Sequence, residues 1–357
     1  MYIEHVSVKG FRNLAPLSLS LSPGLNLFYG NNAQGKTNFL ESIYMCSTGR
    51  SQRTNISREM IGYTETDAYI QAFVRVNIKS CEKIGIHLHK SNKKGIAING
   101  VPIKKLGQLF GHLLTVIFSP EDLQLIKAGP SERRRFIDVE LCQLSAVYYH
   151  ELQQYYYVLK QRNNLLKSIR TSAQLRDTVE VWDQQLVSHG IKIIAYRYKF
   201  IEELSLLAQE SHKRLSNKCE QLTLTYHPST QADDFAEKLA RGIERDIALG
   251  STTVGIHKDD VIFHINNEDV RIYGSQGQQR TAALAAKLAE VGLMTERKQT
   301  SPVLLLDDVL SELDETRQNS LIRSIEDVQT IMTCTNSDIR LPTTALYMVE
   351  NGEIWEQ

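Results

Sequence analysis

The stretch Gly30-Asn-Asn-Ala-Gln-Gly-Lys-Thr37 decides how the rest of the sequence is interpreted. It follows the short apolar segment 25–29 and precedes a segment, 38–47, with a helical pattern that ends near Gly49. Gly30 and Gly35 let the backbone curl so that successive N–H groups face inward, and the helix N-terminus adds partial positive charge. The octapeptide therefore predicts a phosphate-binding loop between a strand and a helix.

Residues of this loop are expected to hold ATP and Mg²⁺. Lys36 should neutralise the β- and γ-phosphates, and the Thr37 hydroxyl should ligate Mg²⁺. A glycine-rich turn that only caps a helix is the alternative, but the complete octapeptide between a strand and a helix favours the phosphate site. The ATP-binding residues predicted from the loop are Gly30, Asn31, Asn32, Ala33, Gln34, Gly35, Lys36, Thr37 and Asn38.

A second part of the same site is predicted near residue 307. The run Val303–Leu306 is continuously apolar, which is typical of a parallel strand covered on both faces. Asp307 then lies where the strand emerges and can hold Mg²⁺, and Asp308 can orient or deprotonate the attacking water. Two aspartates after a strand are more often a helix cap and a solvated turn. The phosphate loop reverses that preference, so Lys36, Asp307 and Asp308 are the predicted catalytic residues.

The segment Gly274-Ser-Gln-Gly-Gln-Gln-Arg280 supplies a third part. Ser275 opens a predicted helix, and a helix N-terminus is an anion site. Ser275 precedes Asp307 by 32 residues, and the three segments together have the order of an ATP-binding cassette head. In that class the helix points away from its own phosphate loop, so Ser275, Gly277 and Gln278 are expected to touch ATP held by a second copy in a head-to-tail homodimer. A plain serine N-cap is the competing interpretation.

The chain resembles the RecF family of bacterial recombinational-repair proteins, which are short relatives of the SMC proteins. The resemblance covers nearly the whole length. The motifs that carry the resemblance lie at residues 9–13, 32–38, 47–50, 118–123, 130–138, 255–260, 273–280 and 304–314. Two departures are Ile256 and Lys258, where the family usually has proline and arginine. Cassettes usually carry glutamate where Asp308 stands, so slow hydrolysis is expected, and many carry a switch histidine where Thr333, Cys334 and Thr335 occur.

The resemblance implies a DNA-repair function with ATP as a switch. Members bind single- and double-stranded DNA at gaps, dimerise on ATP, hydrolyse it weakly in a DNA-dependent way, and work with RecO and RecR to load RecA. Composition alone does not imply this, because 41 basic and 41 acidic residues leave no net charge to attract a polyanion.

Any DNA contact must therefore be local, and two basic clusters could provide it. A solvated charged face is an equally good interpretation of either cluster. The candidate DNA-binding residues are Lys90, Lys93, Lys94, Lys104, Lys105, Arg133, Arg134 and Arg135. Three consecutive tyrosines, 155–157, could stack on bases, although their helical spacing with leucines favours a place in the core.

The predicted fold class is α/β, an SMC-like cassette head with an inserted α-helical arm. Lys36 and Asp307 lie 271 residues apart, which is far more than a compact nucleotide-binding domain needs. The predicted domains are the N-terminal half of the head at 1–129, the helical arm at 130–215 and the C-terminal half of the head at 216–357. Two long helices are expected within the arm, over 181–200 and 201–215.

Cysteine usage and hydropathy limit the other possibilities. Five cysteines without a close pair imply neither a disulfide framework nor a zinc site. The sequence has no signal peptide and no apolar run of about 18 residues, so a cytoplasmic protein without membrane contact is expected.

Two other functional classes fit the sequence less well. The nucleotide-binding subunit of a membrane transporter is disfavoured by the helical insertion and the missing histidine. A small-molecule phosphotransferase would leave 275–280 without a role.

Overall fold

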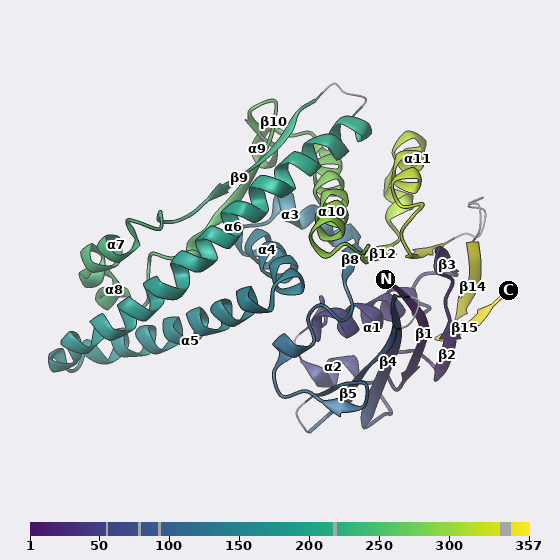
Figure 1. The fold of residues 1–357 in the computed structure, drawn as a ribbon, viewed down its shortest axis with the longest axis horizontal. Helices are drawn as coiled ribbons and strands as arrows, with labels where there is room; N and C mark the ends of the chain where they lie inside the picture. The colour runs from purple at the N-terminus through teal and green to yellow at the C-terminus, as the bar shows by residue number, and fades with distance from the viewer. Residues whose placement is uncertain (55, 78–79, 92–93, 217–219, 336–343) are drawn as a thin grey trace.

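The computed structural model describes residues 1–54, 56–77, 80–91, 94–216, 220–335 and 344–357. Two lobes are visible in Figure 1, one built around sheets and one around long helices. The sequence-based prediction of an α/β head carrying a large helical element is confirmed. Lys93 and Cys219 lie outside the described residues.

The central sheet has six strands in the order β15-β14-β3-β13-β12-β8, all parallel except β15. Its strands are β3 (Leu25–Tyr29), β8 (Thr115–Phe118), β12 (Val303–Asp307), β13 (Thr330–Cys334), β14 (Thr344–Glu350) and β15 (Glu353–Glu356). Strand 25–29 therefore has the bounds that its apolar run predicted, and strand 303–307 extends one residue beyond the predicted 303–306.

Side-chain alternation along β12 divides the core into two parts. Leu304 and Leu306 face a core shared with the long helices, whereas Val303 and Leu305 face a core shared with the N-terminal lobe. All four side chains are fully buried, as expected for a parallel strand covered on both faces. The carboxyl end of the strand, where Asp307 lies, is thereby fixed from both sides.

A second six-stranded sheet, antiparallel throughout, packs beside helix α1 (Lys36–Thr48). Its order is β2-β1-β4-β5-β6-β7. The strands are β1 (Tyr2–Lys9), β2 (Leu17–Ser20), β4 (Asp67–Asn77), β5 (Ser80–His89), β6 (Gly95–Ile98) and β7 (Val101–Pro102). A short helix, α2 (Ser57–Met60), precedes β4.

The helical lobe begins with α4 (Pro130–Leu144) and α5 (Ala146–Ile169), which are separated by Ser145. Ser145 is extended and caps α5 by accepting a hydrogen bond from the Tyr148 backbone N–H. Helix α6 (Val179–Leu215) then returns along α5 as one uninterrupted helix, about 55 Å long at 1.5 Å per residue. The two helices expected over 181–215 are thus a single helix.

The chain after α6 stays with the helical lobe. Strands β9 (Leu222–His227), β10 (Asp260–Ile265) and β11 (Glu268–Asp269) form a small antiparallel sheet, and β9 lies against α6. Helices α7 (Phe235–Arg241) and α8 (Ile243–Leu249) pack at the far end, against α6 and α5 (Figure 1). Residues beyond 215 therefore share this lobe, and the domain limits at 130 and 215 remain predictions.

Helix α10 (Gln276–Lys298) connects the two lobes. It packs along α6 and reaches β8 of the central sheet. Residues 282–286 of α10 are buried, and all of them except Leu284 are alanine. These small side chains let α10 and α6 approach closely. The remaining helices and single turns are η1 (Leu106–Gln108), η2 (Pro120–Leu123), α3 (Gln124–Lys127), η3 (Ala173–Thr178), η4 (Ile256–Lys258), α9 (Val270–Tyr273), η5 (Val309–Glu312) and α11 (Glu315–Ser324).

Candidate functional site

The loop between β3 and α1 needs glycine at both of its predicted positions. Gly30 and Gly35 have φ values of 153° and 115°. A Cβ on Gly30 would lie 2.1 Å from the carbonyl oxygen of Val349, and one on Gly35 would lie 3.0 Å from Leu14. The curled backbone is therefore built into the packing, and α1 begins directly after Gly35.

Two distant segments brace this loop. The Asn13 amide donates to the carbonyl oxygen of Ala33 at 3.3 Å and accepts from the Asn38 amide at 2.7 Å. On the other side the backbone N–H of Gly352 donates to the carbonyl oxygen of Gln34 at 3.0 Å. The loop is held in shape by contacts from both ends of the sequence, so its N–H groups are oriented in advance.

Lys36 lies at the start of α1 with its side chain folded over the loop. Its Nζ donates to the carbonyl oxygens of Gly30 and Asn31, at 2.6 and 2.9 Å. Burial lowers the pKa of Lys36, while Asp308 and Asp307 act in the opposite direction. The ammonium is thus placed where an anion between the loop and the two aspartates would be paired.

Asp307 is the centre of a compact hydrogen-bond group. Its Oδ1 accepts from the hydroxyls of Thr37, at 2.9 Å, and Thr333, at 2.8 Å. Thr333 stands opposite Asp307 in the parallel pairing of β12 with β13 and also accepts from the Asp308 backbone N–H at 3.0 Å. Burial raises the pKa of Asp307. Of the three residues 333–335, Thr333 is thus the one in contact with both aspartates.

A cavity of about 480 Å³ opens between the phosphate loop and the end of β12. It brings together the parts that lie 271 residues apart in the sequence, and a space of this size suits a nucleotide. Asp308, at its edge, has a left-handed backbone with φ of 51°. The lining residues are Asn32, Ala33, Gly35, Lys36, Thr37, Asn38, Arg53, Pro120, Glu121, Asp307 and Asp308.

Arg53 and Glu121 belong to this cavity but were not predicted from the sequence. Arg53 Nη1 donates to Asn38 Oδ1 at 2.8 Å and lies 3.5 Å from buried Glu41, which Arg12 also pairs with. Glu121 comes from the turn after β8. Neither stands in a periodic pattern or a phosphate motif. Glu121 lies within 118–123, one of the segments that carry the family resemblance, and this was the signal that could have pointed to it.

Replacement of Asp307 by asparagine tests this arrangement. Asparagine keeps an oxygen for the hydroxyls of Thr37 and Thr333 but removes the buried charge, whose raised pKa shows that the charge is disfavoured there. We expect the thermal midpoint at neutral pH to be unchanged or higher, and Mg²⁺-dependent ATP hydrolysis to be lost. Calorimetry with a hydrolysis assay checks both; a normal hydrolysis rate would remove Asp307 from the site.

The predicted Ser275 group lies elsewhere. Ser275 caps α10: its hydroxyl accepts from the Gln278 N–H at 3.2 Å, and the Gln278 side chain accepts from the Ser275 N–H at 2.8 Å. Ser275 is exposed and does not line the cavity beside Lys36. In Figure 1 this end of α10 lies beside α9, away from α1. Within one chain the structure therefore does not bring Ser275, Gly277 and Gln278 to the phosphate loop.

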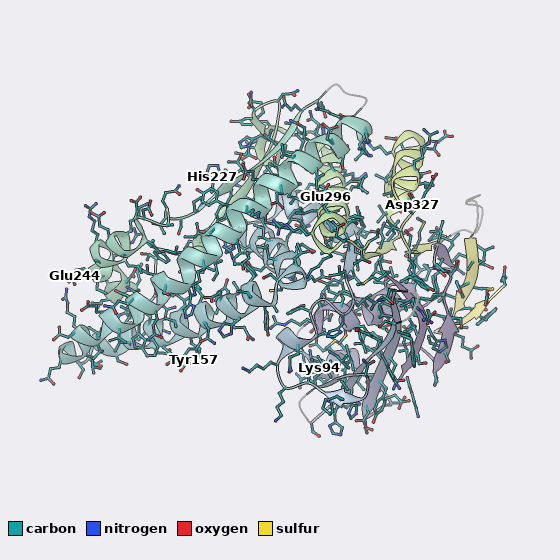
Figure 2. All side chains as sticks on the ribbon, viewed as in Figure 1. Lys94, Tyr157, His227, Glu244, Glu296 and Asp327 are labelled. Atoms are coloured by element: carbon teal, nitrogen blue, oxygen red, sulfur yellow. The ribbon has the colours of Figure 1, made fainter. Side chains whose placement is uncertain are left out.

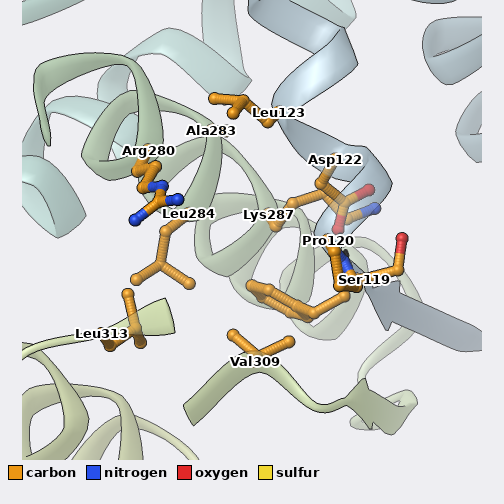
Figure 3. Close-up of a pocket in the computed structure, with 11 residues that line it drawn as sticks. Ser119, Pro120, Asp122, Leu123, Arg280, Ala283, Leu284, Lys287, Val309 and Leu313 are labelled. Carbon is orange, nitrogen blue, oxygen red and sulfur yellow. Dashed lines mark hydrogen bonds between the residues drawn. The ribbon is translucent and has the colours of Figure 1, made fainter. Parts of the chain in front are cut away.

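The middle of α10 nevertheless lies close to the turns after β8 and β12, which lead to the cavity beside Lys36. A small space of about 50 Å³ separates it from the turns after β8 and β12 (Figure 3). Lys287 from α10 and Asp122 from η2 lie on one side of this space, and Val309 and Leu313, from η5 and the residue after it, lie on another. The turns that carry Glu121 and Asp308 to the cavity are thus packed next to α10.

Next to this contact lies a cluster in which three carboxyl groups surround one lysine. Lys287 Nζ donates to Glu290 Oε2 at 2.5 Å, and both are at most 4% exposed. Glu140 from α4 and Asp122 face the same ammonium, and desolvation raises the pKa of Asp122 to about 6. The pKa of Glu140 is raised well above its usual value by burial and by the charge of Glu290. Three carboxylates around one lysine cannot all be ionised without a large cost.

This predicts a pH-dependent stability. A carboxyl group whose pKa is raised on folding binds a proton in the native state, so its stabilising effect is present below its unfolded pKa and is lost as pH rises through the raised value. We expect Glu140→Gln to raise the thermal midpoint at about pH 8 and to have little effect at about pH 5. Melting curves across this range check it; parallel curves for both proteins would show that Glu140 is ionised throughout.

The candidate DNA-binding residues are distributed over two surfaces. Lys90, Lys104, Lys105 and Arg135 are exposed, and Lys94 and Arg134 are half-buried. Arg133 is different: it is 4% exposed, and its guanidinium makes a two-pronged ion pair with Asp260 at 2.6 and 3.0 Å. The structure thus accounts for Arg133 as a link between α4 and β10, with its charge satisfied inside the protein.

No helix in the described ranges has both the length and the apolar composition needed to cross a membrane.

Comparison with known proteins gives consistent matches. The family described as RecF/RecN/SMC N terminal domain matches residues 2–353. The DNA replication and repair protein RecF of Lachnoclostridium phytofermentans is 48% identical over 359 residues and covers 99% of each chain. The protein of the same name from Clostridium botulinum (strain ATCC 19397 / Type A) is 42% identical over 364 residues, also covering 99% of each.

Solved structures agree with this result. The recombination mediator protein RecF-ATP of the RecFOR pathway superposes with a TM-score of 0.94 at 36% identity, over 100% of this chain and 97% of that one. The Smc head domain of Pyrococcus furiosus gives a TM-score of 0.59 at 15% identity, covering 100% of this chain and 96% of that one. The latter similarity indicates a shared head fold.

Proposed function

Because this chain belongs to the RecF family of RecF/RecN/SMC proteins, we propose that it is a DNA-repair protein in which ATP acts as a switch. The observation that carries the proposal is the division of the site. Lys36, Thr37 and Asp307 share one cavity, whereas the Ser275 helix start is exposed on another part of the surface. A second copy is what would complete such a site.

The cavity residues suit a triphosphate with Mg²⁺. The loop N–H groups and Lys36 would hold the β- and γ-phosphates, and Arg53 adds a cation at the rim. Thr37 and Asp307, whose oxygens already lie 2.9 Å apart, would hold Mg²⁺, which supplies charge neutralisation on the phosphates. Asp308 lines the same cavity and would orient the attacking water.

The exposed end of α10 supports the proposed association of two copies. Its capping box leaves the first turn with N–H groups directed outward, and Ser275, Gly277 and Gln278 stand there. Set against the cavity of another copy, they would meet the γ-phosphate, so two ATP molecules would hold a head-to-tail dimer together. Hydrolysis would release it. The shortened acid at Asp308 supports a slow rate.

Relatives in this family are named for DNA replication and repair, and one similar structure is assigned to the RecFOR pathway. We propose that this chain binds single- and double-stranded DNA, works with RecO and RecR to load RecA, and is located in the cytoplasm. The basic residues that support DNA contact are those whose side chains are exposed or half-buried. They are Lys90, Lys94, Lys104, Lys105, Arg134 and Arg135.

Salt dependence of DNA binding tests this part. Removing one lysine that binds a phosphate should reduce the slope of log affinity against log salt by about one. We expect ATP and Mg²⁺ to tighten binding to gapped DNA, and Lys104→Gln with Lys105→Gln to flatten the slope by about two per chain. Lys199→Gln with Lys213→Gln, on α6, is the matched control. Equal slopes for both pairs in fluorescence anisotropy would exclude the loop after β7 from the DNA surface.

A further inference from the structure

A large cavity, separate from the ATP site, lies where the helical lobe meets α1. It has a volume of about 700 Å³, which is within the range of ligand pockets. The end of α1 forms one wall, and α4 and α5 form the others. We call it the arm-base cavity. Its lining includes Arg50, Arg134, Arg135, Asp138, Gln153 and Tyr156.

The charge of the arm-base cavity is positive. Arg50, Arg134 and Arg135 line it, and within the described part of the chain no ion pair is formed by Arg50 or Arg134. Arg134 donates to the backbone carbonyl of Asp259, and Arg135 to that of Gln52, both at 2.7 Å. These contacts fix the two guanidinium groups in direction. Arg135 also lies 3.9 Å from the Glu132 carboxylate on the same helix, so only part of its charge is compensated at this partly exposed pair.

The acid in the wall does not neutralise them. Asp138 Oδ1 accepts from Arg197 Nη2 at 2.8 Å and from the hydroxyl of Tyr148. Arg197 is fully buried behind this wall and is shared between Asp138 and Asp259, at 2.8 and 2.9 Å, so Asp138 is engaged on that side but keeps part of its negative charge. The described side chains that line the cavity therefore carry three guanidinium groups against the single carboxylate of Asp138, which leaves an excess of positive charge.

Lys94 increases the repulsion. Its ammonium hydrogen-bonds the carbonyl oxygen of Gly49, the residue before Arg50, and burial together with the Arg50 charge lowers the pKa of Lys94. Holding like charges close together costs free energy in the isolated protein. An anion bound between them would recover that cost.

One wall also offers an aromatic ring. Tyr156 lines the cavity and is 41% exposed, with its other side in edge contact with Tyr155 at 5.8 Å between ring centroids. Tyr149 lies deeper and is covered by Phe110. Tyr157, the next residue, is 56% exposed but does not line the cavity; Figure 2 shows it on the outer face of α5.

From this combination we infer that the arm-base cavity binds one nucleotide of an unpaired DNA strand. The phosphate lies between Arg50, Arg134 and Arg135, and the base stacks on Tyr156. A base inside a duplex is stacked and paired and does not enter such a cavity unless it is flipped out. The inference rests on the DNA-binding function proposed above and adds a preference for single strands at this place.

The tyrosine pair provides the sharpest test. In the full-length protein with ATP and Mg²⁺, Tyr156→Leu should weaken binding of a fluorescein-labelled oligothymidylate about tenfold and leave duplex binding unchanged. Tyr157→Leu is the matched control and should change neither. Equal effects of the two substitutions, or an equal loss for duplex, would overturn the inference. Circular dichroism melting and ATP binding identify a variant that is merely misfolded.

A second measurement does not depend on removing a tyrosine. Arg50→Gln should weaken oligothymidylate binding and reduce its salt slope by about one, whereas Arg58→Gln, on α2, should not. An oligonucleotide carrying 5-iodouracil should crosslink to Tyr156 on irradiation. A crosslink mapped only elsewhere contradicts the inference, and full competition by free thymidine monophosphate would show a free-nucleotide site. If these fail while salt-dependent, ATP-stimulated duplex binding persists, the proposed function stands without this site.

Discussion

Replacing Lys36 with methionine is expected to abolish the ATP-driven association of two copies. Methionine keeps most of the length of the side chain but has no charge to pair with the β- and γ-phosphates. A hydrogen bond between charged groups contributes about 1.5–3 kcal/mol, so ATP affinity should fall about 10- to 150-fold at each site. A dimer that needs two ATP molecules suffers this loss twice.

The measurement is light scattering over a range of ATP concentrations with Mg²⁺. Because the Lys36 ammonium is buried and its pKa is lowered, its removal should not destabilise the fold, and the thermal midpoint without ATP should be kept. Lys199→Met, which removes an exposed ammonium from α6, is the control and should dimerise normally. Dimerisation of Lys36→Met at the wild-type ATP concentration would refute the role of the phosphate loop.

Substitution of Ser275 by arginine should also abolish dimerisation, but ATP binding should be kept. Ser275 is exposed and does not line the cavity that contains Lys36, so a monomer should bind ATP as before. In the dimer an arginine side chain would occupy the space of the partner's γ-phosphate. Loss of the cap costs only about 1 kcal/mol, which is too little to unfold the protein.

The Ser275→Asn variant distinguishes the effect of side-chain size from the effect of losing the helix cap. Asparagine caps helices about as well as serine and is small, so this variant should still dimerise, although more weakly. Isothermal titration gives the ATP affinity of each monomer, and light scattering gives the mass. Should Ser275→Arg dimerise like the wild type, or lose ATP binding as a monomer, the assignment of Ser275 to the partner's nucleotide would be wrong.

Much of the ATP site could be predicted because its determinants are local. Strand 25–29 has the predicted bounds, and helix 36–48 and strand 303–307 extend at most two residues beyond the predicted 38–47 and 303–306 at either end. Apolar runs, a curled glycine loop and a left-handed C-cap at Gly49 act over a few residues, which is why these elements could be predicted. The resemblance to the RecF family is confirmed by matches over almost the entire chain. The capping role of Ser275 also follows from its immediate neighbours.

What could not be predicted depends on pairs that are distant in sequence. Arg133 is drawn into the interior by Asp260, 127 residues away, and a cluster of arginines does not reveal such a partner. Thr333 is selected by its register opposite Asp307, and Arg53 lies at the cavity through its hydrogen bond to Asn38, 15 residues earlier. Residues 235–249 return to the helical lobe through packing on α5 and α6, which no local pattern announces.

In the proposed mechanism, ATP is enclosed between two copies of this chain. Light scattering of the wild-type protein, with Mg²⁺ and a non-hydrolysable ATP analogue in excess, tests it most directly. We expect a particle of twice the 40.6 kDa mass of one chain, with two nucleotides bound, and a return to the single mass when nucleotide is removed. A particle of single mass that is saturated with the analogue would contradict it.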